Sequence, residues 1–142
     1  MKIKAISLWQ PHATLFSLRL RHIETRGQYF SYRGPILICA AKECREAKRW
    51  YLESSYTHYL LGRYGFPHWR SLPYGQAVAV ANMTGCRKAE TFTPDETGGD
   101  IWGDFSHGRY GLIWENIRPI DPFPVKGKQG LFDVEVPDSL FK

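Results

Sequence analysis

The chain has 142 residues, of which 43% are hydrophobic and 23% are charged, and its net charge is +5. This length suffices for one compact core, and the composition excludes a disordered or fibrous protein. The longest apolar runs are internal and of strand length, so we expect no membrane span and no signal peptide, and we expect a cytoplasmic protein.

The positive charge is concentrated near the start of the chain. Residues 1–50 hold ten Lys and Arg against three Glu, whereas the rest hold nine Lys and Arg against eleven acids. Such a basic surface is typical of proteins that bind polyanions, although it also serves solubility alone. The three cysteines form no CxxC pair and offer no zinc-ligand spacing, so we expect a reducing compartment, no metal and no cofactor.

The first half of the chain alternates between strand and helix patterns. Residues 3–9 predict a strand, and residues 11–21 predict a helix with a proline at its first position. Residues 22–26 alternate, which places His22, Glu24 and Arg26 on one face of a strand. Residues 35–40 predict a buried strand, and residues 41–54 predict an amphipathic helix with a basic stripe.

The second half is richer in strands. Residues 55–65 predict a short helix and residues 66–75 a loop, and strands are expected at 76–90, 109–120 and 130–136. The Gly-rich and acidic segment 93–108 predicts a surface loop with solvated carboxylates, and "VKGKQG" predicts a hairpin turn that presents Lys126 and Lys128. These elements predict an α+β domain built around a small barrel.

The turn "SLWQPH" gathers several side chains at one point. A strand that ends at Leu8 and a helix that begins at Pro11 would leave backbone N–H groups free to bind an anion. Trp9 could stack on a nucleobase, Gln10 could read a base edge, and His12 adds a titratable donor. The alternative is that Trp9 is a core aromatic and Gln10 a capping residue.

A carboxylate flanked by cations follows this turn. Arg21 and Arg26 would keep Glu24 ionised, so that it could accept hydrogen bonds from a base or a proton from water, although a structural ion pair gives the same pattern. Lys42, after the buried strand, could reach a phosphate, and the basic helix could follow the nucleic-acid backbone through Arg45, Lys48 and Arg49. No standard catalytic motif is present, so catalysis would depend on Glu24, Arg21 and Lys42.

The ordered set of motifs resembles the ASCH (activating signal cointegrator homology) family of the PUA-like superfamily. The motifs are "ISLWQPHATLF", "LRHIETR", "YRGPILICAAK", "YGQAVAVANM", "GRYGLIWENIRPI" and "VKGKQGLF", and they extend from about residue 3 to residue 136. The resemblance implies a single ASCH domain over residues 1–142. It implies a PUA-like pseudo β-barrel of about five to six mostly antiparallel strands with flanking helices, and a cleft for RNA or a single nucleotide.

The family's Gly-x-Lys-x-x-Glu-x-Arg pattern falls on residues 19–26. Glu24 and Arg26 match it, whereas Arg19 replaces the glycine and Arg21 the lysine. The run from Ser7 to Pro11 and Lys42 also match, and His12 stands where many relatives carry Trp. Some relatives resemble amidohydrolases that act on acetylated cytidine through a Lys, a Thr and a Glu, and others are ribonucleases. In this chain Arg21 holds the Lys position and Glu24 the Thr position, and an arginine cannot act as a base or nucleophile.

We therefore expect a nucleic-acid-binding module for RNA or a modified or flipped nucleotide. The alternative is a hydrolase that acts on RNA or a modified nucleoside, with Glu24 as general base and Arg21 or Lys42 stabilising negative charge. The residues expected to bind are Ser7, Trp9, Gln10, His12, Arg21, Glu24, Arg26, Lys42, Arg45, Lys48 and Arg49. The sequence does not indicate the oligomeric state, nor whether RNA or DNA is bound.

Overall fold

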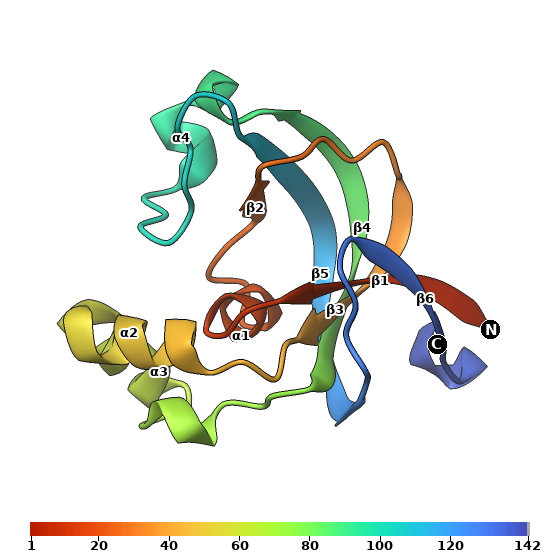
Figure 1. The fold of residues 1–142 in the computed structure, drawn as a ribbon, viewed down its shortest axis with the longest axis horizontal. Helices are drawn as coiled ribbons and strands as arrows, with labels where there is room; N and C mark the ends of the chain where they lie inside the picture. The colour runs from red at the N-terminus through yellow and green to blue at the C-terminus, as the bar shows by residue number, and fades with distance from the viewer. Residues whose placement is uncertain (142) are drawn as a thin grey trace.

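The structure is a computed structural model that describes residues 1–141 of the chain (Figure 1). The strands are β1 Lys2–Leu8, β2 Ile23–Arg26, β3 Gly34–Ala40, β4 Gln76–Lys88, β5 Tyr110–Pro124 and β6 Leu131–Glu135. The α-helices are α1 His12–Ser17, α2 Arg45–Glu53, α3 Ser55–Arg63 and α4 Pro94–Thr97. Short 3-10 turns are η1 Trp69–Ser71, η2 Ala89–Thr91 and η3 Asp138–Phe141. No helix in this part of the chain is both long enough and apolar enough to cross a membrane.

The strands form one six-stranded sheet in the order β2-β5-β4-β3-β1-β6. Only β1 and β3 pair in parallel, and every other neighbouring pair is antiparallel. The sheet is strongly curved, but its edge strands β2 and β6 do not pair, so it stays open (Figure 1). The predicted α+β class with mostly antiparallel strands and flanking helices is confirmed, and an open curved sheet is consistent with a pseudo-barrel.

The parallel pair brings two chain segments to the same edge of the sheet. Leu8 lies opposite Ala40 at the carboxyl ends of β1 and β3, and the Ala41 N–H donates to the Leu8 carbonyl oxygen at 2.8 Å. Trp9 and Lys42, which follow these strands, therefore emerge side by side. In open sheets the carboxyl ends of parallel strands are a common place for ligands to bind.

Helix α1 fills the concave side of the sheet (Figure 1). Its side chains Ala13, Leu15 and Phe16 are fully buried, and Phe16 joins the core formed by strands β1, β3, β4 and β5. Six residues are too few for an isolated helix, so this packing is what stabilises α1. The helix ends at Ser17 rather than at residue 21, because the chain turns at Arg19, whose φ is +59°.

Helix α2 begins four residues later than predicted. The apolar stripe starts at Cys44, but the chain must first leave the sheet after Ala40, and the Arg45 N–H donates to Glu43 Oε1 at 2.8 Å before the helix begins. Lys42 therefore lies in the connection from β3 to α2 and does not open the helix. Ala47 and Tyr51 pack α2 against α3 and α1 in a second hydrophobic cluster.

Two sequence predictions about connections were wrong. Segment 125–130 is no hairpin turn, because β6 pairs with β1 at the far side of the sheet from β5. The acidic segment 93–108 contains the short helix α4, and one of its carboxylates is not solvated: the Asp100 side chain is only 4% exposed and pairs with Arg21. The sequence pattern of a surface loop does not show that a buried arginine elsewhere requires a partner.

Candidate functional site

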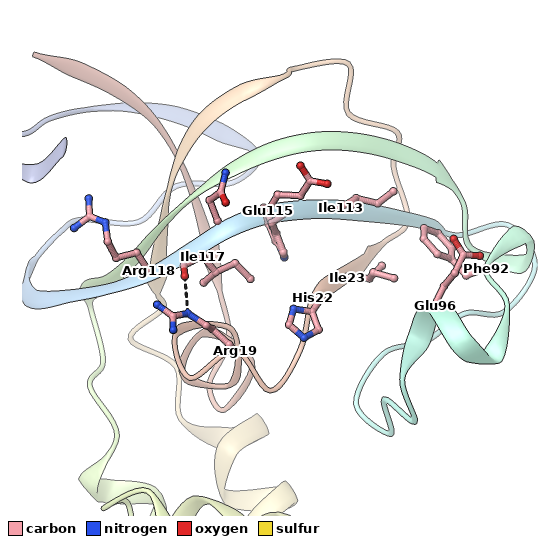
Figure 2. Close-up of a pocket in the computed structure, with 11 residues that line it drawn as sticks. Arg19, His22, Ile23, Phe92, Glu96, Ile113, Glu115, Ile117 and Arg118 are labelled. Carbon is pink, nitrogen blue, oxygen red and sulfur yellow. Dashed lines mark hydrogen bonds between the residues drawn. The ribbon is translucent and has the colours of Figure 1, made fainter. Parts of the chain in front are cut away.

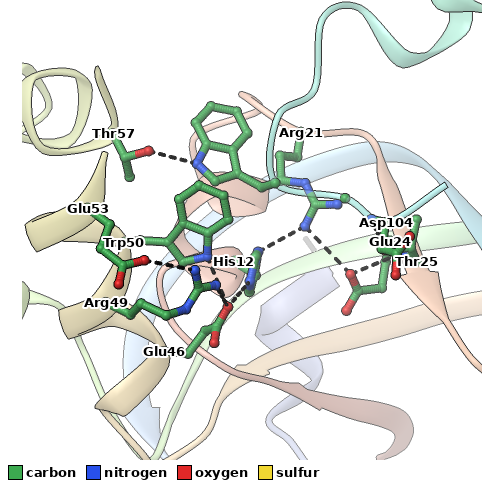
Figure 3. A network of polar contacts seen from close by, with 12 residues as sticks. His12, Arg21, Glu24, Thr25, Glu46, Arg49, Trp50, Glu53, Thr57 and Asp104 are labelled. Atoms are coloured by element: carbon green, nitrogen blue, oxygen red, sulfur yellow. Dashed lines mark hydrogen bonds and ion pairs between the residues drawn. The ribbon is translucent and has the colours of Figure 1, made fainter. Parts of the chain in front are cut away.

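A polar network joins the start of α1 to β2, α2 and the segment after α4 (Figure 3). Its centre is Arg21, whose side chain is 1% exposed. Arg21 Nε donates to Asp100 Oδ2 at 2.8 Å, Nη2 donates to the Ile23 carbonyl at 3.0 Å, and Nη1 lies 3.1 Å from His12 Nδ1. Because arginine can only donate, His12 Nδ1 is the acceptor, and the neutral ring carries its proton on Nε2.

The other edge of the His12 ring faces α2. His12 Nε2 lies 3.7 Å from Glu46 Oε1, which also accepts hydrogen bonds from Arg49 Nη2 at 2.7 Å and from Trp50 Nε1 at 3.0 Å. These donors, His12 foremost, lower the pKa of Glu46 to about 2. The network therefore fixes both the tautomer of His12 and the charge of Glu46 at neutral pH.

The carboxylate of Glu24 lies between two arginines. Glu24 Oε1 accepts the Thr25 N–H at 3.0 Å and lies 3.6 Å from Arg21 Nη1, while Oε2 lies 3.6 Å from Arg26 Nε. Within residues 1–141, Glu24 Oε2 accepts no hydrogen bond, and the buried Arg26 Nε has no acceptor. Arg26 Nε is buried, and buried donors normally have an acceptor; the carboxylate oxygen beside it, Glu24 Oε2, is 3.6 Å away, so an oxygen of a bound molecule could serve as that acceptor.

An exposed indole and an exposed ammonium lie at the sheet edge near these residues. Trp9 is 57% exposed, so the alternative of a core aromatic does not hold. Arg26 Nη2 donates to the Ser7 carbonyl at 3.0 Å, which ties the Glu24 and Arg26 pair to the strand that carries Trp9. The stem of Lys42 runs along Gly75, where a Cβ would lie 3.0 Å from Lys42 Cγ.

A wide groove of about 880 Å³ lies elsewhere, between β5 and residues 19–23 (Figure 2). Arg19 Nε donates to the Ile117 carbonyl at 2.8 Å across one end, and Arg19 and Asn116, both at the groove, have positive φ. None of the predicted binding residues lines this groove. The groove also contains a buried donor without a partner, Trp114 Nε1. We place the candidate site at the polar network because the predicted binding residues are connected there and the ring of Trp9 is exposed.

Comparison with known proteins gives a fold but no close relative. No family model and no curated protein matches the sequence. Solved structures do match: a serine-to-alanine variant of ZmASCH from Zymomonas mobilis has a TM-score of 0.58 at 12% identity, covering 93% of this chain and 87% of that one. A tyrosine-to-phenylalanine variant of the same protein has a TM-score of 0.57 at 13% identity, covering 95% and 91%.

The chain has the fold of an ASCH domain. The resemblance inferred from the motifs is thereby confirmed at the level of the fold. On this ASCH fold, Ser7, His12, Arg21, Glu24 and Arg26 are brought together by one chain of polar contacts. Trp9 and Lys42 lie at the adjoining strand ends, whereas Arg45, Lys48 and Arg49 lie on α2.

Gln10 does not face the surface of the ASCH fold, contrary to its expected role in reading a base edge. It is fully buried, and its Nε2 donates to Thr14 Oγ1 and to the Pro73 carbonyl, both at 2.7 Å. Its Oε1 accepts the Thr14 N–H at 2.9 Å. Gln10 therefore fits the alternative stated above, a residue that caps the start of α1. Since Ala13 N and Leu15 N also donate to chain carbonyls, the start of α1 offers no free anion cradle at these residues.

The network is nearly neutral rather than electropositive. Arg21 is balanced by Asp100 and Glu24, and Arg49 by Glu46 and by Glu53 at 3.4 Å. Arg45 pairs with Glu43 at 3.1 Å. Among the residues that the structure describes, Lys42 and Lys48 have no carboxylate within ion-pair distance. Counting charges along the sequence missed this balance, because Asp100 comes from a distant loop and because a count does not show that Glu24, Glu43 and Glu46 lie beside these arginines.

Asp100, Glu46 and Trp50 are the network residues that sequence reasoning missed. Asp100 looks like its solvated neighbours, and only the burial of Arg21 distinguishes it. Glu46 and Trp50 are spaced i and i+4 on α2, a spacing that allows contact between the two but does not indicate His12 as a third partner. Over residues 1–141, no group of three or more His, Cys, Asp or Glu side chains is arranged to hold a metal.

Proposed function

We propose that this protein binds single-stranded RNA, or an unstacked nucleotide, at the surface formed by Trp9, Glu24, Arg26 and Lys42. One observation carries the proposal: an indole 57% exposed to solvent follows strand β1, whose Ser7 carbonyl accepts a hydrogen bond from Arg26. Arg26 in turn lies beside the nearly buried carboxylate of Glu24, whose Oε2 accepts no hydrogen bond within residues 1–141. Single-stranded nucleic acid is bound through stacking on aromatic rings and hydrogen bonds to base edges. The ASCH-like fold supports the same class of ligand, since the resemblance implies an RNA cleft.

Each residue has a distinct role in this proposal. The face of Trp9 stacks on a base, and Glu24 Oε2 accepts an N–H from the base edge. Arg26 Nε donates to an oxygen of the same nucleotide, and Lys42 contacts a phosphate as a mobile point charge. Arg21 is not a ligand contact, because Asp100, Ile23 and His12 already occupy its donors; it orients Glu24 and His12.

The test is binding of a fluorescently labelled RNA octamer to the wild type and to Trp9→Ala, measured by anisotropy. Loss of one stacked base costs about 1–3 kcal/mol, so we expect affinity to fall by at least about fivefold. The control is Tyr29→Ala, which removes a ring 48% exposed from the connection between β2 and β3. Equal effects of the two substitutions would reject Trp9 as the stacking platform.

A second candidate is hydrolysis of RNA or of a modified nucleoside by the same site. The unsatisfied Glu24 Oε2 favours it, because this oxygen could take a proton from an attacking water. Arg21 is 1% exposed and each of its three nitrogens already makes a hydrogen bond, so Lys42 would have to stabilise the developing negative charge. The test is mass spectrometry of RNA and modified nucleosides after incubation with the protein. If product forms with the wild type but not with Glu24→Gln, while binding persists, the protein is a hydrolase. If the wild type binds without forming product, it is a binding module.

A further inference from the structure

An open hollow of about 390 Å³ lies on the side of α3 that faces the following segment. Its residues are Ser55, His58, Tyr59, Gly62, Arg63 and Pro67, here called the α3 hollow. On this side of α3, His58 Nε2 lies 2.9 Å from the Pro67 carbonyl oxygen, which holds the segment at Pro67 beside the helix. This volume falls within the range of small-molecule sites in proteins.

The cations around the α3 hollow are held by aromatic rings instead of carboxylates. Arg63 lies 5.9 Å from the Tyr59 ring and donates to its hydroxyl at 3.1 Å. Nearby, Arg70 lies 4.3 Å and Lys48 5.7 Å from the ring of Trp69. In the part of the chain that the structure describes, none of these three cations has a carboxylate within ion-pair distance. A cation over a ring keeps its N–H groups free for another acceptor, whereas Arg49, paired with two glutamates, does not.

Exposed aromatic rings are concentrated on the same helix. Tyr59 is 62% exposed, and Tyr56 and Tyr64 are also largely exposed. From residue 45 to residue 71 the chain holds five Lys and Arg and only two acids. Rings interleaved with unpaired cations match single-stranded nucleic acid, which offers planar bases and regularly spaced phosphates. An acidic peptide would match the charge, but it has few planar faces to use the rings.

We propose that the α3 hollow is a second nucleotide subsite for the same RNA strand that binds at Trp9. The base packs on Tyr59, Arg63 contacts its phosphate, and Lys48 and Arg70 follow the backbone. This inference depends on the proposed function and extends it from one nucleotide to a strand. Helix α2 connects the two sites: the Trp50 ring meets His12 edge-on at 6.4 Å, and the next residue, Tyr51, packs on His58 at 5.2 Å.

The chain supplies a matched control for this proposal. In the connection between β2 and β3, Arg33 lies 5.9 Å from the Tyr29 ring and donates to its hydroxyl at 3.2 Å. This pair has the same contacts between arginine and tyrosine as Arg63 and Tyr59, and it lies at the opposite end of the parallel strands from Trp9. Because Arg33 Nη1 also donates to the Phe30 and Tyr32 carbonyls, the two tyrosine substitutions are the closer match.

The experiment compares uridine monophosphate with a labelled uridine 12-mer on the wild type, Tyr59→Ala, Arg63→Ala, Tyr29→Ala and Arg33→Ala, with thermal melts to verify folding. We expect Tyr59→Ala and Arg63→Ala each to weaken 12-mer binding at least about fivefold, with monophosphate binding unchanged and the control variants like the wild type. Arg63→Ala should also reduce the salt slope by about 0.7.

Four results would overturn the subsite. The subsite is rejected if the variants at Tyr59 and Arg63 lose as much 12-mer affinity as those at Tyr29 and Arg33, or if neither pair of variants loses any. It is also rejected if the wild type binds the 12-mer no more tightly than the monophosphate. Preference for a poly-glutamate peptide over the 12-mer, competed at equal charge, assigns the surface to an acidic protein instead. If the wild type binds neither nucleotide nor 12-mer, the proposed function itself fails, which is a different outcome from failure of the subsite alone.

Discussion

The buried guanidinium of Arg21 explains most of the geometry of the candidate site. A guanidinium that is 1% exposed is tolerated only when its N–H groups have acceptors and its charge is balanced. Asp100 provides an acceptor and the opposite charge, with Oδ2 2.8 Å from Arg21 Nε. Asp100 Oδ1 also accepts the N–H groups of Trp102 at 2.8 Å and Gly103 at 2.9 Å. One carboxylate thus holds the loop after α4 and the arginine that orients His12.

Asp100→Asn should destabilise the protein by about 3 kcal/mol. The substitution keeps the size of the side chain but leaves the buried Arg21 charge with only the more distant Glu24 to balance it. Chemical denaturation of the variant measures the loss. Asp95→Asn, at an exposed position in the same acidic segment, is the control and should change the free energy of unfolding by less than about 0.5 kcal/mol. A similar small change in both variants would contradict the structural role of Asp100.

Glu46 should contribute stability that is lost in acid. Its pKa lies near 2 in the folded protein, below the ordinary 4.5, so the folded state binds the proton less readily than the unfolded state. The stabilisation is therefore complete above about pH 5 and disappears as pH falls through the folded pKa. We expect the stability difference between wild type and Glu46→Gln to shrink steadily from pH 5 to pH 2 in denaturation experiments. A pH-independent difference would show that His12 and Arg49 do not bias the ionisation of Glu46.

At the scale of elements, strands were easier to predict than the connections between them. β3 and β4 carry the near-continuous apolar runs of buried strands, β1 alternates between polar and apolar residues, and each strand appears where its pattern indicates. The supposed hairpin at residues 125–130 failed because turn chemistry is local, whereas the partner of β6 is β1, at the other end of the chain. The start of α2 failed for a related reason: periodicity shows which residues share a face, not where the chain leaves a sheet.

Gln10 shows how a residue that connects structural elements can look like a binding residue in the sequence. A polar residue in a conspicuous turn suggested recognition, but its amide connects α1 to the segment at Pro73 from a fully buried position. For Trp9, Glu24 and Arg26 the structure shows an exposed ring and an ion pair connected to the Ser7 carbonyl, and their role in binding stays a prediction. The sequence pattern does not show which side chains turn inward, because that depends on tertiary packing.

Gln10→Leu should lower stability by about 2–4 kcal/mol and leave nucleic-acid affinity unchanged. The substitution replaces the amide by an apolar group of similar size and leaves the Thr14 N–H and the Pro73 carbonyl without their hydrogen-bond partner. Denaturation gives the first quantity, and anisotropy with the RNA octamer, well below the melting temperature, gives the second. The opposite result, normal stability with lost affinity, would restore Gln10 as a base-reading residue.

At the scale of the whole molecule, net charge and available charge differ. The chain carries +5, but many of its arginines are matched by acids in the fold, including Arg21, Arg26 and Arg49 at the network. Counterion release depends on the cations that contact phosphate, and those are the ones without a carboxylate partner. The salt dependence of binding should therefore report Lys42 and the cations near the α3 hollow rather than the total charge.

Lys42→Ala and Arg49→Ala test whether the salt dependence follows the unpaired cations or the total charge. Each variant removes one formal charge from a neighbouring part of the surface. Of the two residues, Lys42 has no carboxylate within ion-pair distance among residues 1–141, whereas Arg49 contacts Glu46 at 2.7 Å and Glu53 at 3.4 Å. We expect the slope of log affinity against log salt for the RNA octamer to fall by about 0.7 in Lys42→Ala and to stay nearly constant in Arg49→Ala. Equal reductions would mean that the ion pairs of Arg49 open on binding, so that total charge governs the interaction.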